Sequence, residues 1–132
     1  MIYVGEGNDR APELEDMDII RGMRARRMVA TNGPMLDFSI NDPNTGVIGS
    51  EIVDTDGQVE LTIDLQAANW VGASIINVVR NGVLIRTITI DADRDLETNP
   101  VHEVLTLDLA QDDEGNAIDS WFVVETFGEK SF

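Results

Sequence analysis

The chain has 132 residues, of which 42% are hydrophobic, and this is enough for one domain with a single core. Its net charge of −16 repels phosphate backbones and anionic membranes, so nucleic-acid binding and membrane binding are disfavoured. The chain has no cysteine and one histidine, His102, which excludes disulfides and thiolate-bound zinc and disfavours an autonomous zinc or iron centre.

The acidic excess, 25 acidic against 9 basic residues, has three interpretations. It is typical of adaptation to salt, of a need for solubility, and of divalent-ion sites. The composition does not separate them, and it leaves the cellular compartment and the oligomeric state open.

The first predicted element is a helix over residues 12–25. Pro12 suits a first helical turn, and the acidic residues after it suit the positive end of the helix dipole. One apolar stripe follows at helical spacing, made of Leu14, Met17, Ile20 and Met23. We expect this to be the only helix.

The end of this helix carries the one basic cluster of the acidic chain, formed by Arg21, Arg24, Arg26 and Arg27. Cations suit the carbonyl end of a helix, so the cluster has a purely structural interpretation. It fits equally well a docking site for an acidic partner surface, for which Arg24, Arg26 and Arg27 are the candidate interface residues.

Residues 31–34, Thr-Asn-Gly-Pro, end the helical pattern and begin a strand pattern. Asn and Gly tolerate positive φ and Pro34 restricts the residue before it, so the structural interpretation is a tight corner. In the functional interpretation, Thr31 and Asn32 face a ligand or a neighbouring active site.

Beyond this corner the apolar residues recur with period two, which predicts strands. We expect about seven, over residues 36–40, 47–52, 59–65, 74–80, 83–90, 105–109 and 117–127. The dipeptide Asn81-Gly82 predicts a type I′ hairpin, because that turn needs positive φ at both centre residues.

The fold class expected from these elements is mainly β: an antiparallel, immunoglobulin-like sandwich with one N-terminal α-helix. No repeat or linker divides the chain, so residues 1–132 are expected to form a single domain. Residues 1–30 would be a helix-bearing bridge segment, and residues 31–132 would be the β-sandwich.

The loop after residue 90 carries alternating acids that suit one hard cation, namely Asp91, Asp93 and Asp95. An EF-hand is excluded, because its sixth position here is Leu96 and its twelfth is His102. A looser calcium site and a solvated loop remain as alternatives. A second acidic loop has the same two interpretations and contains Asp112, Asp113, Glu114, Asn116 and Asp119.

Aromatic side chains on a sandwich surface stack on sugar rings. Trp70, in a predicted loop, is the candidate ligand platform, whereas Trp121 is expected in the core. His102 is expected to be a surface or packed strand residue. No serine or threonine has a local base motif, so no catalytic residue is assigned, and the chain alone is not expected to be an enzyme.

Three segments, in their order and spacing, resemble the C-terminal extension of PHP-family (polymerase and histidinol phosphatase type) metal-dependent hydrolases. They are Arg27-Met-Val-Ala-Thr-Asn-Gly-Pro34, the Val-Val-Arg-Asn-Gly-Val-Leu-Ile hairpin of residues 78–85, and Asp119-Ser-Trp-Phe-Val-Val-Glu125. One departure is Arg26, which stands where the family has a glycine, so a glycine cap at the helix end is not expected.

This resemblance implies a non-catalytic accessory domain that packs on an upstream catalytic domain of the same protein. In the family, the metal-binding His and Asp residues and their divalent metals belong to that upstream domain, and none of its His-x-His motifs occurs here. The chain is therefore expected to be a piece of a larger hydrolase and to hold no cofactor itself. The alternative is a carbohydrate- or calcium-binding β-sandwich module of a secreted or envelope protein.

Overall fold

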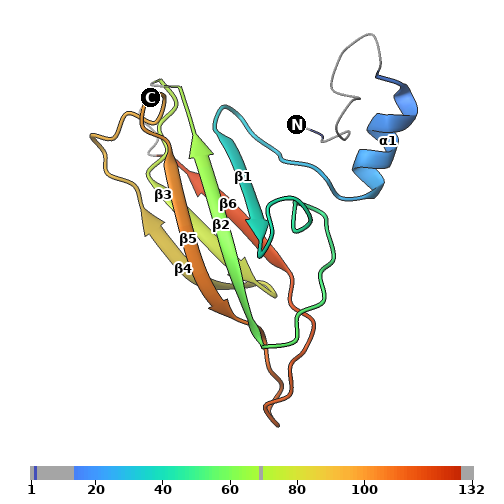
Figure 1. Ribbon diagram of the computed structural model, residues 1–132. Coiled ribbons are helices and arrows are strands. Elements are labelled where there is room, and N and C mark those ends of the chain that lie inside the picture. The colour runs from blue at the N-terminus through green and yellow to red at the C-terminus, as the bar shows by residue number, and fades with distance from the viewer. Residues whose placement is uncertain (1, 3–13, 69, 129–132) are drawn as a thin grey trace.

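The computed structural model describes residue 2, residues 14–68 and residues 70–128. Its elements follow in the order α1 (Asp16–Arg24), β1 (Met35–Ile40), β2 (Gln58–Gln66), β3 (Ile75–Arg80), β4 (Val83–Thr89), β5 (Val101–Asp108) and β6 (Phe122–Phe127). All strand pairs are antiparallel, and they form two three-stranded sheets with the orders β1-β2-β5 and β4-β3-β6. The predicted mainly β fold with one helix is confirmed for these residues (Figure 1).

Three strand predictions differ from the structure. The strand expected at 47–52 is wrong, because only Val47 forms an isolated bridge and Gly49, at a φ of 85°, breaks the extended backbone after it. The fifth strand begins at Val101, four residues earlier than expected. The sequence pattern did not reveal this start, because a glutamate at core-facing position 103 interrupts the apolar alternation. The last strand begins at Phe122 rather than at 117, after a loop segment.

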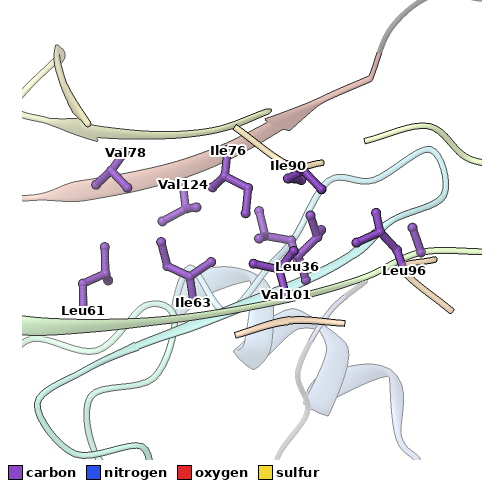
Figure 2. Close-up of a cluster of buried hydrophobic side chains, with 11 residues drawn as sticks. Leu36, Leu61, Ile63, Ile76, Val78, Ile90, Leu96, Val101 and Val124 are labelled. Atoms are coloured by element: carbon purple, nitrogen blue, oxygen red, sulfur yellow. The ribbon is translucent and has the colours of Figure 1, made fainter. Parts of the chain in front are cut away.

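The core is one apolar layer between the two sheets (Figure 2). The central strand β2 supplies Leu61, Ile63 and Leu65, and the central strand β3 supplies Ile76 and Val78, all at 0% exposure. The alternation along β2 therefore has the physical meaning predicted from the sequence, with one face buried and one in water. Each such side chain contributes roughly 1.5–3 kcal/mol relative to an exposed one.

The hairpin between β3 and β4 has the predicted turn, with φ of 50° at Asn81 and 81° at Gly82. Asn81 also joins this hairpin to the beginning of β6. Its Oδ1 accepts a hydrogen bond from the Trp121 amide (2.8 Å), and its Nδ2 donates to the Asp119 carbonyl (3.1 Å). The turn residue thus positions the last strand as well as the hairpin.

We predict that Asn81→Ala lowers the free energy of unfolding by about 2 to 4 kcal/mol, because alanine is strained at positive φ and both side-chain hydrogen bonds are lost. Asn81→Gly tolerates the same φ and loses only the hydrogen bonds, so its cost is expected to be about half. Urea unfolding followed by circular dichroism measures both variants. A wild-type stability in Asn81→Gly would show that the link to β6 contributes nothing.

Candidate functional site

The apolar side of α1 is exposed. Its buried residues are Asp18 and Gly22, which lie one turn apart on the same side. The predicted stripe is exposed, with Met17 at 47%, Ile20 at 38% and Met23 at 49%. Leu14, at 38%, precedes the helix, because α1 begins at Asp16 and the predicted earlier start is wrong. In Figure 1 the helix lies beyond β1, outside both sheets. An exposed apolar helix face of this kind is typical of a contact with a partner.

Polar contacts at the start of α1 satisfy the carboxylate of the buried Asp18. The Glu15 amide donates to Asp18 Oδ2 (3.1 Å), and the two residues form a reciprocal capping box. Arg21 Nη1 donates to Asp18 Oδ1 (3.2 Å). The Asp18 carboxylate is therefore satisfied within the helix. At nine residues, α1 is far too short to cross a bilayer, and the described part of the chain contains no membrane-spanning helix.

The end of α1 is a Schellman motif built without glycine. The Arg26 amide donates to the Met23 carbonyl (3.0 Å), and the Arg27 amide donates to the Gly22 carbonyl (3.0 Å). Arg26 has a φ of 60°, so an arginine adopts the left-handed conformation that glycine usually supplies at this position. The helix therefore ends at Arg24, and the backbone after it leads to β1 of the sandwich.

The three candidate interface arginines do not have the same surroundings. The Arg26 guanidinium lies 2.6 Å from Glu51 Oε1, so it forms an exposed ion pair within the domain. Arg24 and Arg27 are exposed, and neither forms an ion pair within the described ranges. Two of the three arginines are thus available to a partner.

The Thr31 hydroxyl holds the Thr-Asn-Gly-Pro corner together. It accepts a hydrogen bond from the Gly33 amide (3.0 Å) and donates one to the Pro34 carbonyl. The expected positive φ at Asn32 or Gly33 is wrong, because neither residue has one. Glycine is needed at 33 for space instead, since a Cβ there would lie 2.9 Å from the Val71 methyl groups. Thr31 therefore has a structural role, and Asn32 is exposed.

A cleft of about 1430 Å³ opens between the edge strands β1 and β6. Its apolar wall includes Leu36, Phe38 and Ile40 from β1 and Phe122 and Val124 from β6. Thr31, Asn32 and residues 46–54 also line it. Sequence reasoning missed the cleft, because the sequence does not reveal which strands become edges.

The charges around this cleft are mainly negative. Four carboxylates line it, those of Glu51, Asp54, Asp119 and Glu125. They face one guanidinium, that of Arg26, which is already paired with Glu51. The cleft therefore combines an apolar wall with a negative potential, which favours apolar ligands that carry positive charge.

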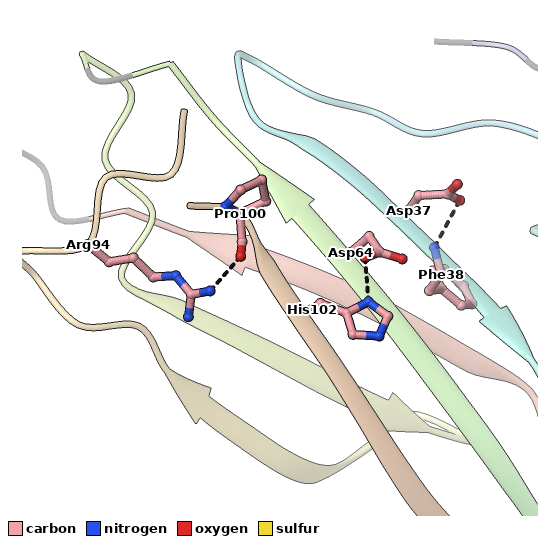
Figure 3. Close-up of polar contacts among 6 residues, drawn as sticks. All are labelled: Asp37, Phe38, Asp64, Arg94, Pro100 and His102. Atoms are coloured by element: carbon pink, nitrogen blue, oxygen red, sulfur yellow. Dashed lines mark hydrogen bonds and ion pairs between the residues drawn. The ribbon is translucent and has the colours of Figure 1, made fainter. Parts of the chain in front are cut away.

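The loop between β4 and β5 is organised around Arg94. Its Nε donates to the Asn99 carbonyl (2.9 Å), and its Nη2 donates to the Pro100 carbonyl (Figure 3). Leu96, on the same loop, is 6% exposed and belongs to the core. A half-buried arginine and a buried leucine thus fix the conformation of this loop, for which a loose calcium site and a solvated loop were the alternatives.

Two of the three candidate calcium ligands in this loop, Asp91 and Asp95, accept hydrogen bonds in separate turns. Asp91 Oδ1 accepts from the Asp93 amide (3.0 Å), and Asp95 accepts from the Glu97 amide (3.0 Å) and the Thr98 hydroxyl (2.7 Å). The Thr98 hydroxyl is the main cause that lowers the pKa of Asp95. In residues 14–68 and 70–128 no three acidic or histidine side chains are placed to share a metal ion, and calcium binding stays a prediction.

Asp112 is the acceptor at the centre of the second acidic loop. The Asn116 amide (2.8 Å), the Asn116 side chain (3.1 Å) and the Glu114 amide (3.0 Å) all donate to its carboxylate. These bonds, that of the Asn116 side chain first, lower the pKa of Asp112 from its ordinary value of 3.8. The carboxylate organises a turn here.

His102 lies on the outer face of the first sheet. Its Nδ1 is 2.7 Å from Asp64 Oδ1 on the neighbouring strand (Figure 3). Asp37 is opposite Asp64 on β1, so the three residues form one row across the sheet. The side chains of His102 and Asp64 are 64% and 58% exposed, and exposed pairs of this kind contribute little to stability. His102 is a surface strand residue, as predicted.

The two tryptophans are both at the surface. Trp70 is 85% exposed in the loop after β2, as a ligand platform requires. The core position predicted for Trp121 is wrong, because its side chain is 55% exposed. Phe122 and Val124 face the core, and strand alternation places Trp121 and Val123 on the outer face.

We predict that the Asp112 turn opens in acid. A carboxylate whose pKa is lower in the folded chain contributes stability above its unfolded pKa of 3.8 and loses it as the pH falls through the folded value. The protection of the Glu114 and Asn116 amides, expressed relative to their intrinsic exchange rates at each pH, should therefore fall below about pH 4. Asp112→Asn should remove most of this pH dependence, and Asp113→Asn should keep it. An identical acid response in Asp112→Asn would contradict the assignment.

The chain matches no protein-family model, no curated protein and no solved structure. A function therefore has to be inferred from the residues and surfaces of this chain.

Proposed function

We propose that the chain is a non-catalytic accessory domain that packs on a catalytic domain through α1. The observation that carries this proposal is the orientation of the helix, which buries Asp18 and exposes its apolar stripe. A stripe made of Leu14, Met17, Ile20 and Met23 is about half exposed, and covering the rest contributes on the order of 1 kcal/mol per side chain. A partner surface supplies that cover.

The charges on α1 indicate the chemistry of this partner surface. Arg24 lies seven residues after Met17, two turns along the same side of the helix. Arg27 follows just beyond the helix end and is also exposed. The matching surface is an apolar patch with carboxylates beside it, because these would pair with the arginines.

The parent protein in this proposal is a PHP-type metal-dependent hydrolase or phosphoesterase. The order of the three motifs supports it: the corner at 31–34, the hairpin at 78–85 and the strand that contains Phe122. The divalent metals and catalytic residues would belong to the upstream domain. The accessory domain would stabilise that domain and shape access to its active site.

The strand order supports an immunoglobulin-like sandwich as the finer description of the fold. The order β1-β2-β5 corresponds to strands A, B and E of that fold, and β4-β3-β6 corresponds to strands C′, C and F. In this assignment the chain supplies six strands and lacks equivalents of strands D and G within the described residues.

The high exposure of Trp70 favours a second candidate, a carbohydrate-binding module. An indole that is 85% exposed in a loop offers a free face for a sugar ring. This candidate differs from the first in its surface, because Trp70 is distant in sequence from α1 and belongs to the loop after β2.

We predict that Met17→Lys combined with Met23→Lys uncouples the domain from its catalytic partner in the full-length protein. The two lysines place charge in the apolar contact, so calorimetry should show separate unfolding transitions in place of a coupled one. Val83→Lys adds a charge at an apolar residue that is 64% exposed on the β4 hairpin, and it should leave the coupling intact.

The same proposal requires His and Asp metal-binding motifs in the coding sequence upstream of Met1. Sequencing that region decides the point directly. A coding sequence without such motifs would contradict the hydrolase assignment. Unchanged unfolding of the variant that carries both lysines would contradict the docking role of α1.

We predict for the carbohydrate candidate that adding glycans changes tryptophan fluorescence and that Trp70→Ala abolishes the change. Trp121→Phe is the matched control, because it removes the other indole and leaves Trp70 in place. A response that disappears in Trp121→Phe and persists in Trp70→Ala would overturn the assignment of the platform to Trp70.

A further inference from the structure

Two three-stranded sheets have four edge strands, β1, β5, β4 and β6. Two of them, β4 and β5, carry a charged residue at a core-facing position, which opposes pairing with a further strand. Arg86 of β4 pairs with the buried Val78, and Glu103 of β5 pairs with the buried Ile63. Paired residues share a face of the sheet, so both charges lie at core-facing positions of an edge strand, with Arg86 exposed and Glu103 half-buried. Inward-pointing charges of this kind oppose the addition of another strand.

The third edge, that of β1, is occupied by hydrogen bonds from the chain itself. The Phe38 amide donates to the adjacent Asp37 carboxylate (2.9 Å; Figure 3), and the Ile40 amide donates to the Gly46 carbonyl (2.8 Å). A Cβ at Gly46 would lie 1.8 Å from the Ile40 carbonyl oxygen, so only glycine allows this approach. The outward amides of Phe38 and Ile40 are therefore already used.

The fourth edge, that of β6, has neither a core-facing charge, as on β4 and β5, nor a described segment of the chain bonded along it, as on β1. The Asn81 amide donates to the Trp121 carbonyl (3.0 Å) where the β3–β6 pairing begins. Because hydrogen-bonded pairs alternate in an antiparallel ladder, the backbone groups of Phe122, Val124 and Thr126 point away from β3. No strand in the described segments pairs with this side of β6, and its core-facing side chains are uncharged.

The apolar cleft lies along this open edge, between β6 and β1. A strand placed beside β6 is about 20 Å long over six residues, and its backbone pairs with the free amides and carbonyls. Its alternate side chains cover the wall formed by Leu36, Phe38 and Phe122. The side chains between them face outward near Glu125, among the carboxylates of the cleft.

We propose that the cleft binds an extended segment of a partner polypeptide, which adds to β6 as a further strand. The segment is apolar at every second residue, because these residues face the wall of the cleft. It is basic between them, because four carboxylates line the cleft. This site is separate from the apolar stripe of α1. In the immunoglobulin-like arrangement proposed above, the added strand takes the place of strand G.

The first test uses a short synthetic peptide that alternates valine with lysine. It should raise the Tm saturably and slow hydrogen exchange at the amides of Phe122, Val124 and Thr126. A peptide of the same composition with its valines and lysines in two blocks should bind much more weakly, as should an alternating valine and glutamate peptide. Equal binding of all three peptides, or binding without protection of these three amides, would overturn the proposal.

A charge on the core-facing side of β6 provides the second test. Thr126→Lys places a charge at a core-facing position of β6, as Arg86 does on β4. It should weaken binding of the alternating peptide about tenfold or more. Thr89→Lys makes the same charge change on the opposite edge strand of this sheet and should leave the affinity unchanged. Equal effects of the two variants would contradict a site along β6. If Thr126→Lys does not fold, the exchange pattern of the wild-type protein decides.

A second copy of the chain is the competing occupant of this edge, by β6 pairing with β6. Sedimentation of the wild-type protein without peptide tests it. A monomer is expected. A dimer that Thr126→Lys dissociates and Thr89→Lys leaves intact would show that a second copy fills the cleft, and it would overturn the partner segment.

Discussion

The apolar layer between the two sheets is the constraint on which the rest of the structure depends. Each sheet has three strands, so each has one central strand, and these two strands carry the most completely buried side chains. Leu61 and Ile63 from β2 face Ile76 and Val78 from β3 across that layer (Figure 2). A core this narrow leaves four of the six strands as edges, and the exposed edge groups become the main structural problem of the domain.

The surface charge sets the second constraint. A net charge of −16 on 132 residues produces self-repulsion. The described part of the chain offsets little of it, with two arginine–carboxylate ion pairs that each have an exposed member. The arginines at the end of α1 are the exception to this acidic surface. Helix and cleft therefore differ in charge: α1 suits an acidic partner, whereas the cleft suits a basic segment.

The elements that the sequence predicted well are those whose pattern is local. The alternation around Ile63, the Asn81-Gly82 turn and the apolar spacing of α1 each follow from a few neighbouring residues. Predictions failed where a distant contact decided the outcome. Trp121 is outside the core because the alternation of β6 places Phe122 and Val124 on the core side, with the start of that strand held by Asn81. The start of β5 was missed because Glu103 occupies a core-facing edge position.

For the candidate surfaces too, some features follow from the local sequence and others only from contacts between distant residues. The sequence by itself determined that the domain is mainly β, that it is strongly acidic, and that one amphipathic helix ends in arginines, because composition and periodicity are properties of the chain. Only the tertiary structure decided that the apolar side of α1 faces outward, that Thr31 closes a turn, and that the edge of β6 is open beside a cleft. Strand order and helix orientation are set by contacts between residues far apart in the sequence, such as Arg26 with Glu51, and no local pattern encodes them.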